Sequence, residues 1–128
     1  IISLLFSVLS HLKRMCVVHW DLNCSNILYD SKENCIKVID FGVAHYIDNN
    51  LFYSPEGNPK FRPPLNERDF NAFEVDFWGV WLVGIGILKG RVVGTKEVEK
   101  HMDVDFNFSK EGWKCELMNK NKLDWQVY

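Results

Sequence analysis

The sequence lacks the features that assign a chain quickly to several common classes of protein. Its four cysteines form no C-x-x-C pair and have no ligand-like spacing with the four histidines, so neither a zinc site nor a disulfide framework is indicated. Fifteen basic and seventeen acidic side chains give a net charge of −2 without a basic stripe, which disfavours nucleic-acid binding. We therefore expect a reducing, cytoplasmic location and no nucleic-acid partner.

Long hydrophobic segments are also missing. The apolar run at residues 1–9 resembles the core of a signal peptide, but no basic residues precede it and no small-residue cleavage site follows. The run from Phe77 to Leu88 has twelve residues, fewer than the roughly 20 that span a bilayer. Membrane insertion is not expected. Because the chain begins with Ile rather than Met, we expect further residues upstream.

The composition is nevertheless sufficient for one folded domain. The chain has 128 residues, which is the length of a single typical domain. Apolar residues make up 47% and aromatic residues 14% of the sequence, so a core can form. Neither internal repeats nor low-complexity segments are visible.

Two helices are predicted from the spacing of apolar residues. Residues 1–15 place apolar side chains at a helical period and end on Lys13 and Arg14, which suit the negative end of a helix dipole. An almost uncharged helix is predicted to follow Asp76 and to end at Lys89, with Gly90 as its C-terminal cap. A helix that is apolar on all sides must lie in the core.

The rest of the chain is predicted to contain short strands and loops. Two apolar segments, 27–29 and 35–39, flank a polar turn at 30–34 and predict a β-hairpin. All four prolines lie between residues 42 and 69, which predicts a long loop there. Residues 91–128 are polar, with scattered large apolar residues, and predict one or two short helices at most.

Three polar residues near the hairpin have a spacing suited to phosphoryl transfer. Asp21 and Asn26 lie five residues apart on one loop, and Asp40 follows the second strand of the hairpin. Phosphoryl transfer needs a positioned acceptor hydroxyl and metal ions that neutralise phosphate charge. Carboxylate and amide oxygens are suitable ligands for such ions. Taken singly, each residue is better explained as a turn cap, or as an Asx turn at Asp40; the ordered set is much less expected by chance.

Four ordered motifs resemble those of the protein kinase superfamily. H-W-D-L-N-C-S-N (19–26) is similar to the catalytic loop H-R-D-L-x-x-x-N, and I-D-F-G (39–42) matches the metal-binding D-F-G segment. G-N-P-K-F-R-P-P-L (57–65) resembles the end of an activation segment, and residues 76–90 resemble the central buried helix of the family. The resemblance covers residues 1–90. It implies a mainly α fold with a small β-hairpin region (α+β), a kinase-like C-lobe without the N-lobe, followed by an extension at 91–128.

The resemblance also implies roles for individual residues. Asp21 would orient the proton of the substrate hydroxyl as the catalytic residue, and Asn26 and Asp40 would hold Mg²⁺ beside ATP. The other implied residues are Asn23, Leu28 and Ile39 for ATP binding; Phe41, Gly42, Gly57 and Pro64 for the D-F-G and activation segment; and His19 and Asp76 for structural support. Asp76 would accept hydrogen bonds from the catalytic-loop backbone, although its position suits a plain helix N-cap equally well.

Several residues depart from the family pattern. Trp20 replaces the arginine that commonly pairs with an activation-loop phosphate, so ordering by phosphorylation is not expected. Asn23 replaces a lysine and removes positive charge where negative charge develops. Asn58 stands where threonine is usual, and Leu65 replaces a glutamate. These losses weaken the case for efficient catalysis but leave the metal-binding set intact.

The 128 residues contain no Gly-rich loop, no strand lysine and no partner glutamate for it. Such a piece would not exclude water from a bound nucleotide. We therefore expect this piece alone to transfer phosphate poorly or not at all.

Three functions are compatible with these patterns. The first is a protein kinase that, in a complete parent, transfers the γ-phosphate of ATP to a protein, with a slight preference for Ser/Thr over Tyr. The second is a non-catalytic, pseudokinase-like module that docks on a partner, possibly another kinase; the substitutions at Trp20, Asn23 and Leu65 favour it. The third and weakest is a small-molecule phosphotransferase of kinase-like fold, against which Gly42 and the segment at 63–65 argue. The oligomeric state is not indicated.

Overall fold

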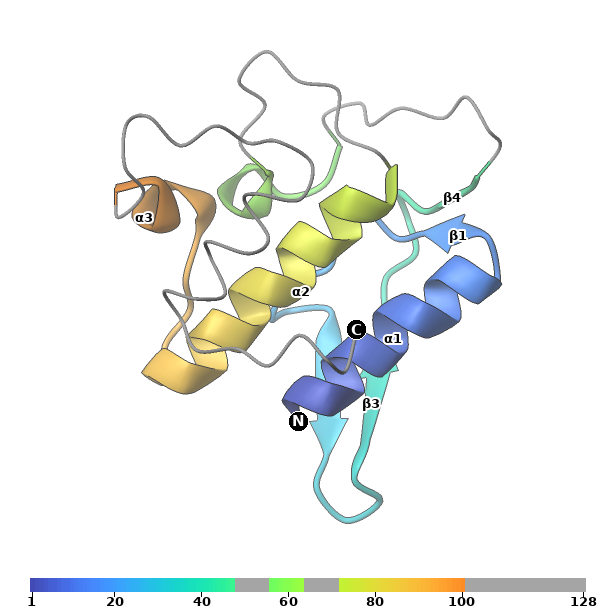
Figure 1. Cartoon of the computed structure of the whole chain (residues 1–128), viewed down its shortest axis with the longest axis horizontal. Coiled ribbons are helices and arrows are strands. Elements are labelled where there is room, and N and C mark those ends of the chain that lie inside the picture. Colours follow the sequence, from blue (N-terminus) through green and yellow to red (C-terminus); the bar gives the residue numbers. More distant parts are fainter. Residues whose placement is uncertain (48–55, 64–71, 101–128) are drawn as a thin grey trace.

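A computed structural model describes residues 1–47, 56–63 and 72–100 of the chain (Figure 1). The described residues form helices and two small antiparallel sheets, which confirms the predicted α+β class. Pro64 and Leu65, and all residues after Lys100, lie outside the described residues, so the predictions made for them stay predictions.

Helix α1 (Ile2–Arg14) forms one side of the core. Its buried side chains are Leu5, Phe6, Leu9 and Leu12, at the spacing of one helical face. The ring of Phe6 packs against that of Phe77, with the ring centroids 6.3 Å apart. The helix therefore lies where the apolar period predicted it, and its buried face contacts the central helix.

The predicted hairpin is confirmed. Strands β2 (Ile27–Asp30) and β3 (Cys35–Val38) pair antiparallel, with Ile27 opposite Val38. The carboxylate Oδ1 of Asp30 accepts hydrogen bonds from the backbone N–H groups of Lys32 and Glu33, an Asx-type turn. In Figure 1 the hairpin extends away from the helices.

A second, shorter ribbon was not predicted. Strand β1 (Val17–Val18) pairs antiparallel with β4 (His45–Tyr46). Two residues are too few to show an alternating pattern, so β4 has no recognisable sequence signal. The ribbon matters because β1 leads directly into the polar loop at residues 19–26, and β4 follows the D-F-G residues.

Helix α2 (Ala72–Lys89) is the centre of the core, and most of its residues are buried. It begins four residues before Asp76, so the reading of Asp76 as the helix N-cap is wrong. Glu74 lies in the first turn, where the helix dipole favours an acidic residue, and Asp76 follows it within the helix. Gly90, with φ of +69°, follows its end as predicted. Within the described ranges, no helix has the length and hydropathy to cross a membrane.

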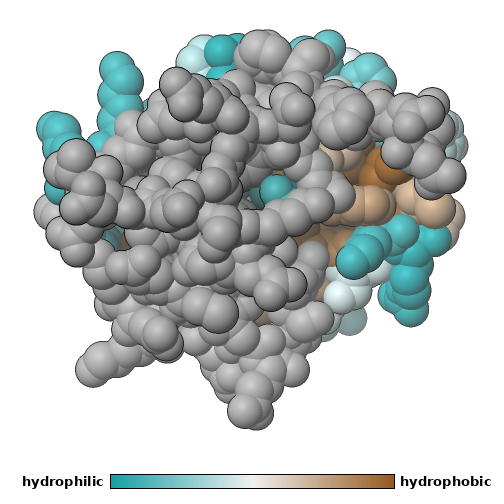
Figure 2. All heavy atoms as spheres, turned by 45° about the horizontal axis from the view of Figure 1, so that its top comes forward, coloured by the Kyte–Doolittle hydropathy of each residue, from teal (hydrophilic) through white to brown (hydrophobic). Residues whose placement is uncertain are grey.

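The short elements η1 (Pro59–Phe61) and α3 (Thr95–Lys100) are joined to the core by one threonine. The indole N–H of Trp78, which is fully buried on α2, donates to Thr95 Oγ1 at 3.0 Å. The same hydroxyl donates to the carbonyl of Arg62, just after η1. Some apolar side chains remain exposed, and Figure 2 shows hydrophobic surface gathered at one side of the face that it draws.

Candidate catalytic loop and metal-binding residues

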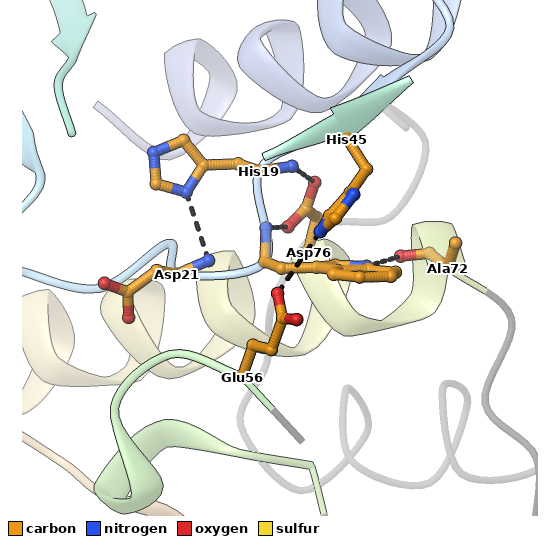
Figure 3. A network of polar contacts seen from close by, with 7 residues as sticks. His19, Asp21, His45, Glu56, Ala72 and Asp76 are labelled. Carbon is orange, nitrogen blue, oxygen red and sulfur yellow. Dashed lines mark hydrogen bonds and ion pairs between the residues drawn. The ribbon is translucent and has the colours of Figure 1, made fainter. Parts of the chain in front are cut away.

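The carboxylate of Asp76 on α2 fixes the loop at residues 19–26 through two hydrogen bonds to the loop backbone. Its Oδ2 accepts the backbone N–H of His19, and its Oδ1 accepts that of Trp20, each at 2.8 Å. All three residues are buried, so these are charge-assisted hydrogen bonds in a region of low dielectric. Figure 3 shows the carboxylate between the two backbone nitrogens.

Burial dominates the electrostatics of Asp76. Removal of the carboxylate from water raises its pKa and the hydrogen bonds from His19 and Trp20 lower it, and the net result is a pKa of about 6 compared with the usual 3.8. The two backbone donors therefore offset only part of the desolvation cost.

Trp20 is fixed by contacts that sequence reasoning missed. Its backbone has a φ of +66°, its indole N–H donates to the carbonyl of Ala72 at 3.2 Å, and its ring lies 4.7 Å from that of His45. His45 in turn contacts the carboxylate of Glu56 at 3.2 Å (Figure 3). Trp20 thus joins the loop to α2 and to β4. The sequence showed only that an arginine was absent.

The carboxylate of Asp21 is surrounded by hydrogen-bond donors. Its Oδ1 accepts from the side chain of Asn23 at 3.1 Å and from the backbone of Asn58 at 3.0 Å. Its Oδ2 accepts from the side chain of Asn26 at 3.2 Å. The structure therefore brings Asp21 and Asn26 together, and it also brings residue 58 to the same carboxylate.

Gly57 is required for this approach. With φ of +80°, it adopts a backbone conformation that favours glycine. A Cβ at this position would lie 2.7 Å from the carbonyl oxygen of Trp20 and 3.1 Å from Oδ1 of Asp21. Only a residue without a side chain fits between this segment and the loop.

Asn26 and Asp40 are brought close by the hairpin. The backbone N–H of Ile39, the residue before Asp40, donates to the backbone carbonyl of Asn26 at 2.9 Å. Oδ1 of Asp40 accepts from the N–H of Gly42 at 3.2 Å, so the Asx-turn hydrogen bond weighed for this residue is present. Its other carboxylate oxygen carries no hydrogen bond from a described residue.

The oxygen atoms at this site are suitable ligands for a hard cation such as Mg²⁺. The amide nitrogen of Asn26 donates to the carbonyl and to the carboxylate of Asp21, which orients the amide oxygen away from these acceptors. No described residue donates to that oxygen. Among the described residues, no group of three His, Cys, Asp or Glu could hold a metal ion. A cation here therefore depends on the oxygen of Asn26 together with carboxylate oxygens.

His19 connects the loop to the D-F-G residues. Its Nδ1 accepts the backbone N–H of Asp21 at 3.1 Å, so its Nε2 carries the proton that is donated to the carbonyl of Ile39 at 2.9 Å. Its buried ring meets the ring of Phe41 edge-on, with centroids 4.8 Å apart. One imidazole thus fixes the relative positions of residues 21 and 39–41.

The residues assigned to ATP differ in their surroundings. Leu28 and Ile39 are exposed by 48% and 42%, and Phe41 by 50%, so apolar surface is available beside the polar site. Asn23 is only 3% exposed. Its amide nitrogen donates to Asp21, and its amide oxygen accepts from the backbone of Ser25 at 2.9 Å, so both ends of the amide are bonded within the loop.

Comparison with known proteins agrees with the motifs. The family model described as protein kinase domain matches residues 1–125. A probable serine/threonine-protein kinase KIN1 homolog of Encephalitozoon cuniculi is 35% identical over 114 residues, which cover 83% of this chain and 20% of that protein.

Two further relatives show the range of the similarity. Testis-specific serine/threonine-protein kinase 5 of Mus musculus is 29% identical over 69% of this chain and 24% of its own length. A putative tyrosine-protein kinase of Caenorhabditis elegans is 31% identical over 67% of this chain and 27% of its own length. The chain therefore spans about a fifth to a quarter of these relatives.

Proposed function

Because the chain belongs to the protein kinase family, we propose that the protein that carries it transfers the γ-phosphate of ATP to a hydroxyl group of a protein substrate, on serine or threonine. The names of the first two relatives contain the words serine/threonine-protein kinase, and this supports the choice of acceptor. In this proposal the chain is the C-lobe of the kinase domain, with residues 1–90 as its core, and it acts in the cytoplasm.

The observation that carries the proposal is the arrangement around the carboxylate of Asp21. Three amide donors, from Asn23, Asn26 and Asn58, hold this carboxylate in place. A fixed carboxylate can accept a hydrogen bond from a substrate hydroxyl and orient its oxygen for attack. Asp21 is therefore the catalytic residue of the proposal, and His19 and Asp76 position it through the loop backbone.

Asn26 and Asp40 would hold Mg²⁺ in this proposal. The bound cation would neutralise charge on the phosphates of ATP. The residues of the chain contribute orientation: the amide of Asn26 is turned by Asp21, and Asp40 is held by its contact with Gly42. Leu28 and Ile39, beside the site, offer apolar surface to the adenine ring.

The substitution Asp21→Asn tests the proposal in the full-length protein. We expect the rate of phosphate transfer to a serine-containing protein or peptide to fall by at least about 100-fold, because general-base assistance and orientation of the hydroxyl are lost together. Transfer would be measured with labelled ATP.

Asp30→Asn is the matched control. Asp30 lies on β2 and caps the hairpin turn, and asparagine keeps an oxygen for that role, so transfer should be unchanged. Equal transfer by the wild-type protein and Asp21→Asn would contradict the proposal.

A second candidate function is a non-catalytic module that docks on a protein partner, possibly another kinase. The observation that favours it is the apolar surface at Leu28, Ile39 and Phe41, together with an uncharged Asn23 at a position where the family usually has lysine. Under this alternative, Asp21→Asn would leave the biological activity of the protein intact, whereas charged substitutions at Phe41 would abolish it.

A further inference from the structure

The imidazole of His45 lies against the catalytic loop, and none of the roles derived above uses it. His45 is on β4, opposite Val18 of β1, and β1 leads directly into the loop. Its ring lies 4.7 Å from that of Trp20, at an interplanar angle of 51°. Trp20 is only 4% exposed, and its indole N–H donates to the carbonyl of Ala72. The imidazole therefore packs on a buried ring that is itself bonded to α2.

A ring nitrogen of the same imidazole contacts an acidic residue. Nε2 of His45 lies 3.2 Å from Oε2 of Glu56 (Figure 3). The two side chains are 43% and 40% exposed, so both remain in contact with water. A carboxylate forms a stronger hydrogen bond with a charged imidazolium than with a neutral imidazole. The contact between β4 and Glu56 is therefore stronger when both ring nitrogens of His45 carry a proton.

Glu56 directly precedes the segment that contacts the carboxylate of Asp21. Gly57 approaches the loop so closely that an added Cβ would lie 3.1 Å from Oδ1 of Asp21. The backbone N–H of Asn58 donates to the same oxygen at 3.0 Å. Only two peptide units, each of them planar, separate the Cα atoms of Glu56 and Asn58. A restraint on Glu56 therefore also restrains the donor at Asn58.

We propose that His45 is a positioning residue for phosphate transfer: its protonated imidazole holds Glu56, and thereby the N–H of Asn58, against the carboxylate of Asp21. The inference rests on the proposed function and adds a regulation of the same site by pH. A histidine side chain ordinarily loses its charge as the pH rises from 5 to 8. The stabilising contribution of the ion pair is therefore present at the acidic end of this range and is lost toward its alkaline end.

Other titratable groups lie near the ion pair. On β1, the residue opposite His45 is Val18, which does not titrate. On the loop, both ring nitrogens of His19 have other hydrogen-bond partners. On α2, Asp76 has a pKa of about 6 and titrates in the same range, whereas Arg62, which donates to the carbonyl of Gly57, stays charged. Each comparison below is therefore between proteins that keep these groups unchanged.

The first test uses hydrogen–deuterium exchange of the full-length protein, resolved to single residues, and needs no chemistry. In Glu56→Gln, we expect protection of the Asn58 N–H to fall about threefold at pH 6, as for a partly exposed ion pair, and to change little at pH 8. The control amide is that of Ile39, which donates to the carbonyl of Asn26 and should be unaffected. Glu33→Gln, which removes an exposed carboxylate from the hairpin turn, should leave both amides unchanged.

The second test measures transfer to a serine peptide by the full-length protein. In Glu56→Gln, kcat should fall about threefold at pH 6 and change little at pH 8, relative to the wild-type protein at the same pH. Arginine in place of His45 keeps a planar cation that packs on aromatic rings and pairs with carboxylates at either pH. In a His45→Arg background, Glu56→Gln should therefore lower kcat about threefold at both pH values.

The two tests separate failure of this inference from failure of the proposed function. Equal protection of the Asn58 N–H in the wild-type protein and in Glu56→Gln at pH 6 would overturn the inference, and so would equal kcat values at pH 6. Equal losses at pH 6 and pH 8 would also overturn it, because a contact that does not depend on the charge of His45 behaves in this way. The expected exchange pattern in a protein that transfers no phosphate would support the restraint on Asn58 and reject the kinase proposal alone.

Discussion

At the scale of single residues, Asp76 has the largest influence on the geometry of the loop. It is 3% exposed, yet it satisfies two backbone N–H groups that would otherwise be buried without partners. An unpaired buried donor costs about 1–3 kcal/mol. The carboxylate therefore loses its contact with water, and its two hydrogen bonds fix the backbone conformation of residues 19 and 20.

Asp76 is expected to make the stability of the protein depend on pH. Its pKa in the folded state is about 6, compared with an ordinary value of 3.8, so between these values the folded state binds more protons than the unfolded state. Its stabilising contribution is present below pH 3.8 and is lost as the pH rises through about 6. The free energy of unfolding should therefore fall by up to about 3 kcal/mol over this range, relative to Asp76→Asn. Urea denaturation at several pH values measures it.

The control for this experiment is Asp30→Asn, on the surface hairpin. The lost hydrogen bond in Asp76→Asn adds a cost that does not vary with pH, so only the difference in slope is diagnostic. Parallel pH curves for the wild-type protein and Asp76→Asn would contradict the assignment of a raised pKa to this carboxylate.

The candidate site was partly predictable at this scale. The spacing of Asp21 and Asn26 on one loop correctly indicated that their side chains meet. The roles of Trp20 and Asn23 within the loop were not predictable, because their partners are set by backbone conformation and by contacts such as that with Ala72, 52 residues away. A departure from the family pattern shows which usual side chain is absent, but it does not show which residues the new side chain contacts.

At the scale of elements, the packing of α2 against the catalytic loop depends on Gly79. A Cβ at this position would lie 2.3 Å from the backbone carbonyl oxygen of Leu22. A backbone atom cannot move away from such a clash as easily as the end of a flexible side chain can. The helix and the loop therefore approach each other more closely than any residue with a side chain would permit.

Gly79→Ala should consequently destabilise the protein. We expect a loss of at least about 1–3 kcal/mol in the free energy of unfolding, because the loop must move away from the helix. Gly84→Ala on the same helix is the matched control: no described atom lies within 4 Å of its added Cβ, and alanine favours a helix over glycine by about 0.5–1 kcal/mol. Thermal denaturation of both variants measures the difference. Equal destabilisation by the two would show that the close contact with Leu22 is not the cause.

The elements themselves were predicted to different degrees. Helix α1 and the β2–β3 hairpin have clear apolar periods and polar turn residues, and both were confirmed. The start of α2 was placed too late, because Asp76 was read as a residue that precedes the helix, whereas the helix begins at Ala72. Strand β4 exists only through its pairing with β1, a tertiary contact that no local pattern encodes.

At the scale of the whole molecule, the proposed function predicts that the described residues contact only one side of a bound nucleotide. Leu28, Ile39 and Phe41 are all about half exposed beside Asp40. We expect the 128-residue chain to bind ATP with Mg²⁺ only weakly, because a ligand covered on one side keeps contact with water. Isothermal calorimetry measures the affinity, with Asp40→Asn as the comparison. Micromolar binding that Asp40→Asn abolishes would show that these residues suffice without further cover.

The bond between His19 and Asp76 also bears on biosynthesis. These residues are 57 positions apart in the chain, and ribosomes add about 5–20 residues per second. Roughly 3–11 s therefore pass between the synthesis of residue 19 and that of residue 76. Until Asp76 has been made, its hydrogen bonds to the backbone of His19 and Trp20 cannot form, so we expect the nascent H-W-D segment to lack this fixed backbone conformation.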